Sequence, residues 1–454
     1  MLNLNNFSHI HFIGCGGAGM FPLAAIMQQR GFKVSGSDLS INEKTTKLEK
    51  LGVNFFLGHS KDNLPLTNTE TDKILVVYSS AVDDTNLEFL AAKETNLIML
   101  RRGVFLGLLA NSYKKVITVS GSHGKTSITA MTVFLFNYFN IKASWIIGGE
   151  IVEEIEAFNE AIDNNIFITE VDESDGTHTD IHSFIGLIPN IEDDHSWSVG
   201  GDEQLMANFK QYANQADKIF SIKGKHPKNF WDNFSGDLTL LPAITSESQA
   251  KQYFIPKDLI TNWGFYQMEN ALLAVNALSE FGIDKKDALK ALNNFPGIKR
   301  RAICHYKAKN DKLQLIEDYA HHPTEVNSII STMLRRFPNK QLWVIFQPHR
   351  YARLEKYLTQ FAKELSNANK IFITPVFAAW VNKNHIDSNS LARLITTKVD
   401  LISHNWKTEA KKILTEARQN DSAKILLVLG AGDINQLLNE MKNILFENEK
   451  FKKI

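Results

Sequence analysis

The amino-acid sequence predicts an α/β protein built from doubly wound parallel sheets. Short apolar runs rich in Val, Ile and Leu alternate with segments of helical spacing along the whole chain. This alternation is typical of parallel strands that are buried on both faces and connected by helices. The chain has 454 residues, which is more than one hydrophobic core usually holds. We therefore expect three α/β domains, at residues 1–110, 111–297 and 298–454.

The expected strands follow the apolar runs in chain order. They lie at residues 9–14, 73–80, 115–121, 166–172, 184–190, 313–319, 342–348, 370–376 and 424–430. Residues 20–32 and 355–368 have helical spacing and good helix formers, so we expect helices there. A polar stretch near 107–115 and a stretch with Pro and Gly at 293–302 mark the two domain boundaries.

Composition excludes several classes of protein. Lys plus Arg and Asp plus Glu both number 50, so the chain lacks the basic surplus of a nucleic-acid binder. Cys15 and Cys304 are the only cysteines, which excludes a disulfide framework and a Cys-based zinc site. No Lys or Arg precedes the first apolar run, and no run approaches the roughly 20 residues that span a bilayer. We expect a cytoplasmic protein without membrane insertion.

The first glycine cluster, IGCGGAGM, follows an expected strand and precedes an expected helix. Gly14, Gly16 and Gly19 fit the spacing G-x-G-x-x-G, with Gly17 between them. Such glycines let a diphosphate approach backbone N–H groups at a helix N-terminus. Asp38 ends the expected second strand, where an acidic residue often meets a ribose hydroxyl. These residues favour a dinucleotide or nucleotide-sugar site over a tight turn without ligand, and they do not distinguish NAD from a UDP-sugar.

The second glycine turn, SGSHGKTS, again joins a strand to a helix. Gly124 frees the backbone to approach a phosphate, Lys125 can reach the β- and γ-phosphates, and the Thr126 hydroxyl can bind Mg²⁺. The full P-loop pattern fails because Val119 occupies the position of its first glycine. A chance Gly-Lys-Thr in a loop is the alternative, and the flanking strand and helix argue against it.

Two acidic clusters stand at the ends of successive strands. The first holds Glu170, Asp172, Glu173 and Asp175, and the second holds Glu192, Asp193, Asp194 and His195. Carboxylates at these ends lie over the crevice where open α/β sheets bind ligands, and Mg²⁺ prefers oxygen ligands. The pattern indicates a metal site in preference to solvated acidic loops.

Two further polar clusters follow strands of the third expected domain. They contain Asp318, His321 and His322, then His349, Arg350 and Arg353. The two arginines are three residues apart, so they share a helix face if a helix begins there. Arginine forks suit the recognition of carboxylates or phosphates.

In this order the motifs resemble those of the Mur ligase family, the ATP-dependent amide-bond ligases of peptidoglycan precursor synthesis. They are GCGGAG, GSHGKT, EVDESD, NIEDDH, DYAHHPTE, FQPHRYAR and GAG, and they extend over essentially the whole chain. The resemblance implies an N-terminal Rossmann-like domain that binds a UDP-sugar, a central P-loop-type ATPase domain and a C-terminal Rossmann-like domain that binds an amino acid. It also implies that ATP phosphorylates the carboxylate of UDP-N-acetylmuramate, that L-alanine then displaces the phosphate, and that Mg²⁺ takes part. We expect these small molecules as the partners, and a chain that is a monomer or homodimer.

The resemblance also implies roles for individual residues, by the match of each motif. The ATP residues are Gly121, Ser122, His123, Gly124, Lys125, Thr126, Ser127, Asn270, Arg301 and Asp318. The UDP-sugar residues are Gly14, Gly16, Gly17, Ala18, Gly19, Asp38, Ser79 and Ser80. The residues on the amino-acid side are His321, His322 and Arg353. The catalytic residues are Lys125, Glu170, His195, His349 and Arg350, and the metal ligands are Thr126, Glu170 and His195.

Some positions depart from the family pattern. Tyr266 and Gln267 stand where His and Asn are usual near the adenine, and Asp433 stands where Asn is common. Besides the ligase, three other functions remain open, and the departures motivate one of them, the paralogue without catalysis. One is a sibling ligase that attaches a preformed tripeptide to the same sugar during recycling. The others are a nucleotide-sugar-binding paralogue without catalysis and an NAD-dependent oxidoreductase.

Overall fold

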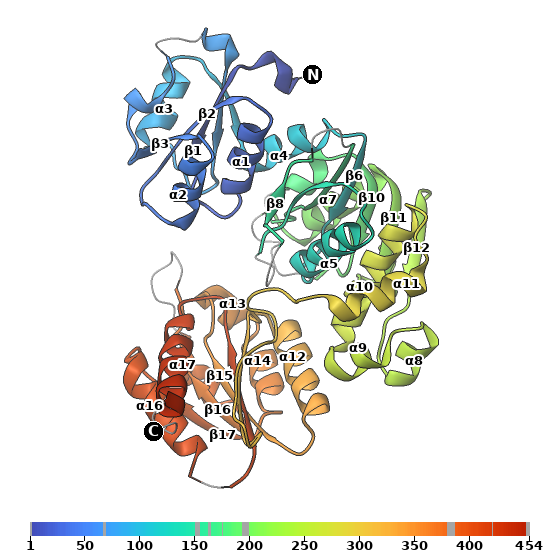
Figure 1. Cartoon of the computed structure of the whole chain (residues 1–454), viewed down its shortest axis with the longest axis vertical. Coiled ribbons are helices and arrows are strands. Elements are labelled where there is room, and N and C mark those ends of the chain that lie inside the picture. Colours follow the sequence, from blue (N-terminus) through green and yellow to red (C-terminus); the bar gives the residue numbers. More distant parts are fainter. Residues whose placement is uncertain are drawn as a thin grey trace. The chain divides into compact units, whose positions relative to one another are not determined.

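The computed structural model describes residues 2–66, 70–149, 155–161, 165–174, 176–192, 199–378, 386–419 and 421–450. They form two compact units: the first comprises residues 1–256 and 267–296, and the second comprises 257–266 and 297–454. Three sheets confirm the α/β class (Figure 1). The division into three domains at 110/111 and 297/298 stays a proposal.

The first sheet has five parallel strands in the order β3-β2-β1-β4-β5. Its strands are β1 (His9–Ile13), β2 (Lys33–Asp38), β3 (Asn54–Leu57), β4 (Ile74–Tyr78) and β5 (Ile98–Arg101). Its helices are α1 (Phe21–Gln29), α2 (Glu43–Lys50), α3 (Leu87–Glu94) and α4 (Arg102–Ala110). The order reverses beside β1, which places the turn after β1 where open α/β sheets bind ligands.

The second sheet has the order β12-β11-β10-β6-β9-β7-β8, and only the pair β7–β8 is antiparallel among the described strands. Its strands are β6 (Lys115–Val119), β7 (Ser144–Ile146), β8 (Phe158–Asn159), β9 (Ile166–Glu170), β10 (Ser183–Ile188), β11 (Ala216–Ile222) and β12 (Asp237–Leu241). Its helices are α5 (Lys125–Tyr138), α7 (Asp202–Asn214), α8 (Glu247–Gln252), α10 (Phe265–Ser279) and α11 (Lys285–Ala291), with a 3₁₀ turn η4 (Thr177–Asp180). The central strand β6 is buried beyond its first residue. The second glycine turn therefore begins at the end of a strand that lies in the core.

The third sheet lies in the second unit and has the order β13-β14-β18-β15-β16-β17. Its strands are β13 (Ile303–Lys307), β14 (Leu313–Asp318), β15 (Gln341–Phe346), β16 (Lys370–Ile373), β17 (Lys398–Leu401) and β18 (Lys424–Leu429), and β13 runs antiparallel to β14. Its helices are α9 (Lys257–Asn262), α12 (Pro323–Arg336), α13 (Tyr351–Lys356), α14 (Leu358–Leu365), α15 (Ser388–Ala392), α16 (Trp406–Ala417) and α17 (Asn435–Lys450). The helix expected at 355–368 is thus two helices, because the backbone leaves the helical region at Tyr357.

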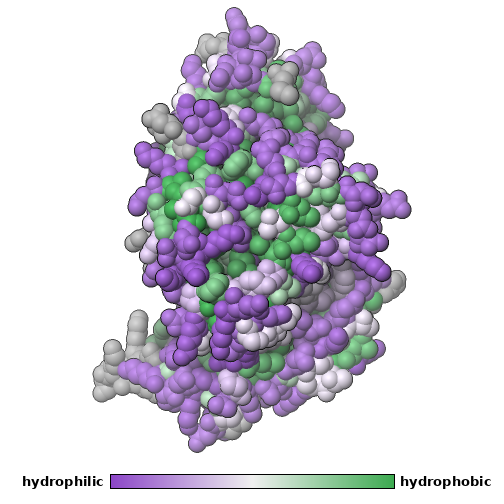
Figure 2. All heavy atoms as spheres, turned by 90° about the vertical axis from the view of Figure 1, so that its right-hand side faces the viewer, coloured by the Kyte–Doolittle hydropathy of each residue, from purple (hydrophilic) through white to green (hydrophobic). Residues whose placement is uncertain are grey.

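The surface is mainly polar. On the face in Figure 2, hydrophilic residues predominate and hydrophobic ones gather in smaller patches between them, as on most globular proteins. Among the described residues, no helix combines the length and the apolar character that crossing a bilayer requires.

Candidate active site

The first glycine turn is fixed by the neighbouring strand β2. The backbone N–H groups of Gly14 and Cys15 donate to the Ser37 carbonyl at 2.8 and 2.9 Å. The Gly16 N–H donates to Asp38 Oδ2 at 2.9 Å. A Cβ on Gly16 would lie 2.9 Å from that same oxygen, so the close approach requires glycine. Asp38 therefore holds the turn itself, and its contact with a ribose stays a prediction.

The remaining predicted UDP-sugar residues lie around this turn. The Ser79 N–H, just past β4, donates to the Ile13 carbonyl at 3.2 Å. Ser80 follows it and is exposed, as are Gly17 and Ala18. The carboxyl ends of β1, β2 and β4 thus present these residues at one edge of the first sheet.

The second glycine turn joins β6 to α5 and depends on two left-handed glycines. Gly121 has φ +152° and Gly124 has φ +88°, a region that side chains disfavour. A Cβ on Gly124 would lie 2.9 Å from Asn270 Oδ1, which places the predicted ATP residue Asn270 against the turn. Ser127 follows in the first turn of α5 and is half-buried.

Lys125 lies over its own turn and pairs with a buried carboxylate. Its Nζ donates to the Gly121 carbonyl and to Glu173 Oε2, both at 2.7 Å. Burial opposes the charge of Lys125, but the carboxylates of Glu173 and Asp172 outweigh it and raise its pKa. Glu173 is 1% exposed, and burial raises its pKa even beside Lys125. The ammonium group is thus charged and already positioned.

Thr126 and Glu170 meet at the end of β9. The Thr126 hydroxyl donates to Glu170 Oε2 at 2.9 Å, and the Gly148 N–H donates to the other oxygen. Burial raises the pKa of Glu170, which the Thr126 hydrogen bond and the charge of Lys125 only partly counteract. A hydroxyl oxygen and the oxygens of a buried carboxylate are ligands that suit Mg²⁺.

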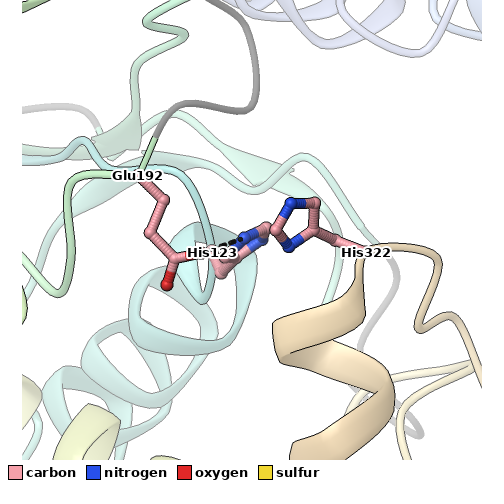
Figure 3. A group of neighbouring side chains, drawn as sticks. All are labelled: His123, Glu192 and His322. Atoms are coloured by element: carbon pink, nitrogen blue, oxygen red, sulfur yellow. Dashed lines mark ion pairs between the residues drawn. The ribbon is translucent and has the colours of Figure 1, made fainter. Parts of the chain in front are cut away.

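The backbone of the turn is held by residues that follow β10. The Ser122 hydroxyl donates to the Glu192 carbonyl at 2.9 Å and accepts from the Glu192 N–H at 2.8 Å. Asn190 accepts from the His123 N–H at 2.8 Å and donates back to the His123 carbonyl at 3.0 Å. The side chains of His123 and Glu192 also face each other, with Nε2 and Oε2 3.5 Å apart (Figure 3).

One cavity joins the two glycine turns. It measures about 240 Å³ and is lined by the end of the first turn, by α4 and by the second sheet, including Ala18, Gly19, Arg102, Lys125, Gly148, Glu170 and Asp172. In the first unit, predicted UDP-sugar residues and predicted catalytic residues therefore line the same cavity. Asp175, Asp193, Asp194 and His195, by contrast, lie outside the described residues.

In the second unit, Asp318 supports the backbone. Its Oδ1 accepts from the Ala320 N–H at 2.8 Å and its Oδ2 accepts from the Ala302 N–H at 2.9 Å. Burial raises the pKa of Asp318 to about 6. Arg301 lies in the same turn as Ala302 and pairs with Glu325 at 3.5 Å.

Three predicted residues of the second unit form one cluster. The ring centroids of His321 and His349 are 5.6 Å apart, and Arg353 Nη1 lies 3.5 Å from His349 Nδ1. His349 also stacks on Phe377, with centroids 5.4 Å apart. Burial lowers the pKa of His321 to about 4, so its ring is neutral at pH 7.

His322 and Arg350 occupy other positions. His322 caps α12, because its Nδ1 accepts from the Thr324 N–H at 3.4 Å. Arg350 precedes α13 with φ +67°, and its N–H donates to the Phe377 carbonyl at 2.8 Å. The condition for a shared helix face with Arg353 is therefore not met, because the helix begins one residue after Arg350.

The structure also shows where the residues that depart from the family pattern lie. Tyr266 belongs to the second unit and Gln267 to the first. Burial raises the pKa of Tyr266 far above its usual value. Asp433 accepts a hydrogen bond from Gln347 Nε2 at 2.6 Å.

Sequence reasoning did not find three residues that shape the site: Asn190, Gly148 and Arg102. Asn190 stands at the start of the NIEDDH motif, directly after its strand, so its position was a usable signal. Arg102 lies in the stretch LRRGVFLGLL, which also resembles the family pattern, but the sequence assigned no role to Arg102 or Gly148, because only the fold brings them to the site.

Comparisons with known proteins cover nearly the whole chain. Residues 9–114 match the description "Mur ligase family, catalytic domain", and residues 304–432 match "Mur ligase, glutamate ligase domain". The chain is 33% identical over 472 residues to the UDP-N-acetylmuramate–L-alanine ligase of Prochlorococcus marinus strain NATL1A, covering 97% of this chain and 94% of that protein. The corresponding ligase of Syntrophomonas wolfei is 30% identical over 477 residues, covering 97% of each.

Solved structures agree with these relatives. The UDP-N-acetylmuramate–alanine ligase of Thermotoga maritima superposes with a TM-score of 0.74 and 25% identity, covering 97% of this chain and 99% of that one. A murein peptide ligase from Psychrobacter arcticus shares the fold, with a TM-score of 0.62 and 19% identity over 96% of this chain and 99% of that one. From its motifs, its fold and its relatives, the chain belongs to the Mur ligase family.

Proposed function

We propose that this chain is an ATP-dependent ligase that joins L-alanine to the carboxylate of UDP-N-acetylmuramate in peptidoglycan precursor synthesis. Relatives with that printed name match over nearly their full length. The observation that carries the proposal is the cavity lined by Gly19 of the first glycine turn, by Lys125 of the second glycine turn and by Glu170 at the end of β9. A nucleotide sugar seated on the first turn would present its acid group to a nucleotide seated on the second.

The chemistry follows from the need to activate a carboxylate, whose oxygen is a poor leaving group. A carboxylate oxygen attacks the γ-phosphorus of ATP, and ADP leaves. The amine nitrogen then attacks the carbonyl carbon of the acyl phosphate, loses a proton and expels phosphate. Lys125, held in place by Glu173 at 2.7 Å, would stabilise the charge that develops on the transferred phosphoryl group.

We propose that Thr126 and Glu170 hold Mg²⁺, together with His195. When bound, the ion would neutralise phosphate charge. Among the described residues, Thr126 and Glu170 are 2.9 Å apart and offer oxygen donors. Glu170 needs such a partner, since burial raises its pKa in this structure.

The second unit would supply the amino-acid side of the reaction. Arg353 and Arg350 offer guanidinium forks for a carboxylate. The lowered pKa of His321, about 4, keeps this ring neutral at pH 7 and therefore able to accept a hydrogen bond. Because ATP and nucleotide sugars are cytoplasmic metabolites, we place the reaction in the cytoplasm.

Phosphate release by the purified protein tests the proposal. The protein is given UDP-N-acetylmuramate, Mg²⁺ and ATP, together with L-alanine, glycine, L-serine or a tripeptide. Release that depends on L-alanine is expected. Release only with the tripeptide would identify the recycling ligase, and no release with any acceptor would favour a paralogue without catalysis.

A further inference from the structure

Arg102 lies between the two glycine turns. It is the first residue of α4, and its side chain is 25% exposed. A Cβ on Gly19 would lie 2.8 Å from Arg102 Nη1, so the guanidinium covers the end of the sugar turn. On its other side, Nη2 lies 3.8 Å from Asp172 Oδ2, which is longer than a hydrogen bond.

The backbone that carries Arg102 is fixed against the second sheet. A Cβ on Gly103 would lie 1.9 Å from Thr177 Oγ1, and one on Gly107 would lie 3.1 Å from the Asp180 carbonyl oxygen. Asn111, just after α4, donates to that same carbonyl at 3.2 Å. The helix therefore packs directly on η4 and holds Arg102 at a set distance from the catalytic residues.

The charges in the cavity leave a role for a second cation. Of the described residues that line it, Glu170 and Asp172 are acidic and Lys125 and Arg102 are basic. Lys125 is engaged with Glu173 and the Gly121 carbonyl. A substrate carboxylate that enters this cavity meets two carboxylates, and the guanidinium of Arg102 would offset their repulsion, in addition to Lys125 and the proposed Mg²⁺.

We propose that Arg102 binds the carboxylate of the acid substrate and holds it for phosphoryl transfer. The guanidinium fork binds two carboxylate oxygens at once, and Arg102 lines the same cavity as Lys125 and Glu170. This inference rests on the proposed function, because it requires an acid substrate in the cavity. It assigns to Arg102 a role in substrate binding rather than in binding ATP.

Two ligands that differ in the carboxylate test the inference. UDP-N-acetylmuramate carries the acid group, and UDP-N-acetylglucosamine has the same diphosphate and lacks that group. Calorimetry without ATP compares the wild type with Arg102→Ala, Arg102→Lys and the control Arg101→Ala, whose arginine is exposed and adjacent. Arg102→Ala is expected to weaken UDP-N-acetylmuramate about tenfold to a hundredfold and to leave UDP-N-acetylglucosamine within about twofold.

Turnover gives the second readout. The KM for UDP-N-acetylmuramate should rise in Arg102→Ala while the KM for ATP stays unchanged. Arg102→Lys, which keeps the charge and loses the fork, should fall between wild type and alanine. Because lysine preserves most of the side-chain volume, this variant also serves if the alanine variant fails to fold.

Other outcomes overturn the inference. Equal weakening of both ligands would assign Arg102 to the diphosphate, and no weakening of either would leave it a structural partner of Asp172. Failure of the proposed function looks different, since the wild type would then bind UDP-N-acetylmuramate no better than UDP-N-acetylglucosamine or would release no phosphate with L-alanine. Such a wild type overturns both proposals.

Discussion

At the scale of single residues, the buried carboxylate of Glu173 holds the ammonium group of Lys125 in place, and Lys125 keeps its positive charge. Burial disfavours the ionised form of the Glu173 carboxyl group and therefore raises its pKa. The pair nevertheless keeps the ammonium group charged and points it at its own turn. Lys125 is therefore positioned before any nucleotide arrives, which reduces the reorganisation that phosphoryl transfer requires.

Lys125→Ala should reduce turnover at least about a hundredfold and leave nucleotide-sugar binding nearly unchanged. The fold should persist, because Glu173 can take up a proton once its partner is lost. Phosphate release measures the first effect and calorimetry with UDP-N-acetylmuramate the second. Lys114→Ala, at an exposed neighbouring position, is the matched control. Loss of sugar binding together with turnover would contradict the separation of the two turns.

Asp318 and His321 should give opposite pH dependences of stability. The folded pKa of Asp318 is raised from 3.8 to about 6, so its contribution to stability is full below pH 3.8 and declines as the pH rises through 6. The folded pKa of His321 is lowered from 6.5 to about 4, so its contribution is full above pH 6.5 and is lost as the pH falls through 4.

Free energies of unfolding in urea at pH 5 and pH 6 measure both groups. Asp318→Asn should make stability rise more steeply with pH than in the wild type, by up to about 1.4 kcal/mol per pH unit. His321→Gln should change the slope in the opposite direction by a similar amount. Changes of the same sign in the two variants would contradict this account.

How far a residue could be predicted depended on where its partners lie in the sequence. The two glycine turns are contiguous motifs, so Gly16, Gly124 and Lys125 could be identified locally. Arg102 meets Gly19 and Asp172, which lie about seventy to eighty residues away on either side. Only the packing of α4 on η4 brings these segments together, so no local pattern predicts the contact. The roles of the site residues stay predictions.

At the scale of elements, burial decided which strands the sequence could predict. The central strands β15 and β18 are buried from their second residue on, and after Gln341 and Lys424 each forms one continuous apolar run. The edge strands β12 and β17 are half-exposed and carry polar residues, so their short patterns resemble loops. The fold class could therefore be predicted, whereas the full width of each sheet could not.

The contact between α4 and η4 should be sensitive to a single added methyl group. Gly103→Ala would place a Cβ 1.9 Å from Thr177 Oγ1, and Thr177 is 2% exposed, so the side chain has little room to move. Overpacking of this kind costs about 1–3 kcal/mol, which exceeds the gain of about 1 kcal/mol from replacing glycine in a helix. Thermal unfolding should show a lower Tm.

Two further variants of this contact separate packing from helix propensity. Val104→Ala changes the neighbouring side chain, which is 44% exposed, and should leave the Tm nearly unchanged. Adding Thr177→Ala to Gly103→Ala removes the clashing oxygen and should restore part of the loss. A Gly103→Ala protein as stable as the wild type would show that the two elements separate easily.

At the scale of the whole molecule, the chain passes between its two units three times, after residues 256, 266 and 296. The short segment 257–266 belongs to the second unit because Arg335 of α12 holds it. Arg335 Nη1 donates to the Ile260 carbonyl at 2.6 Å, Nη2 donates to the Trp263 carbonyl, and the guanidinium lies 5.0 Å from the centre of the Phe265 ring.

Arg335→Ala should release this segment from α12. Hydrogen exchange of its backbone amides is expected to accelerate at least about tenfold, because hydrogen bonds from a charged donor are lost. The rest of α12 should keep its protection. Arg336→Ala removes the adjacent arginine, which lies over Phe337 instead, and should leave the segment unchanged. Equal exchange in both variants would show that other contacts hold the segment.

This attachment limits how the C-terminal part can be cut from the protein. A fragment that starts at residue 298 would lack Ile260 and Trp263, so Arg335 would face solvent where it now has two backbone acceptors. A recombination event or an expression plasmid that moves the C-terminal part by a single junction at residue 298 would therefore separate Arg335 from both of these acceptors.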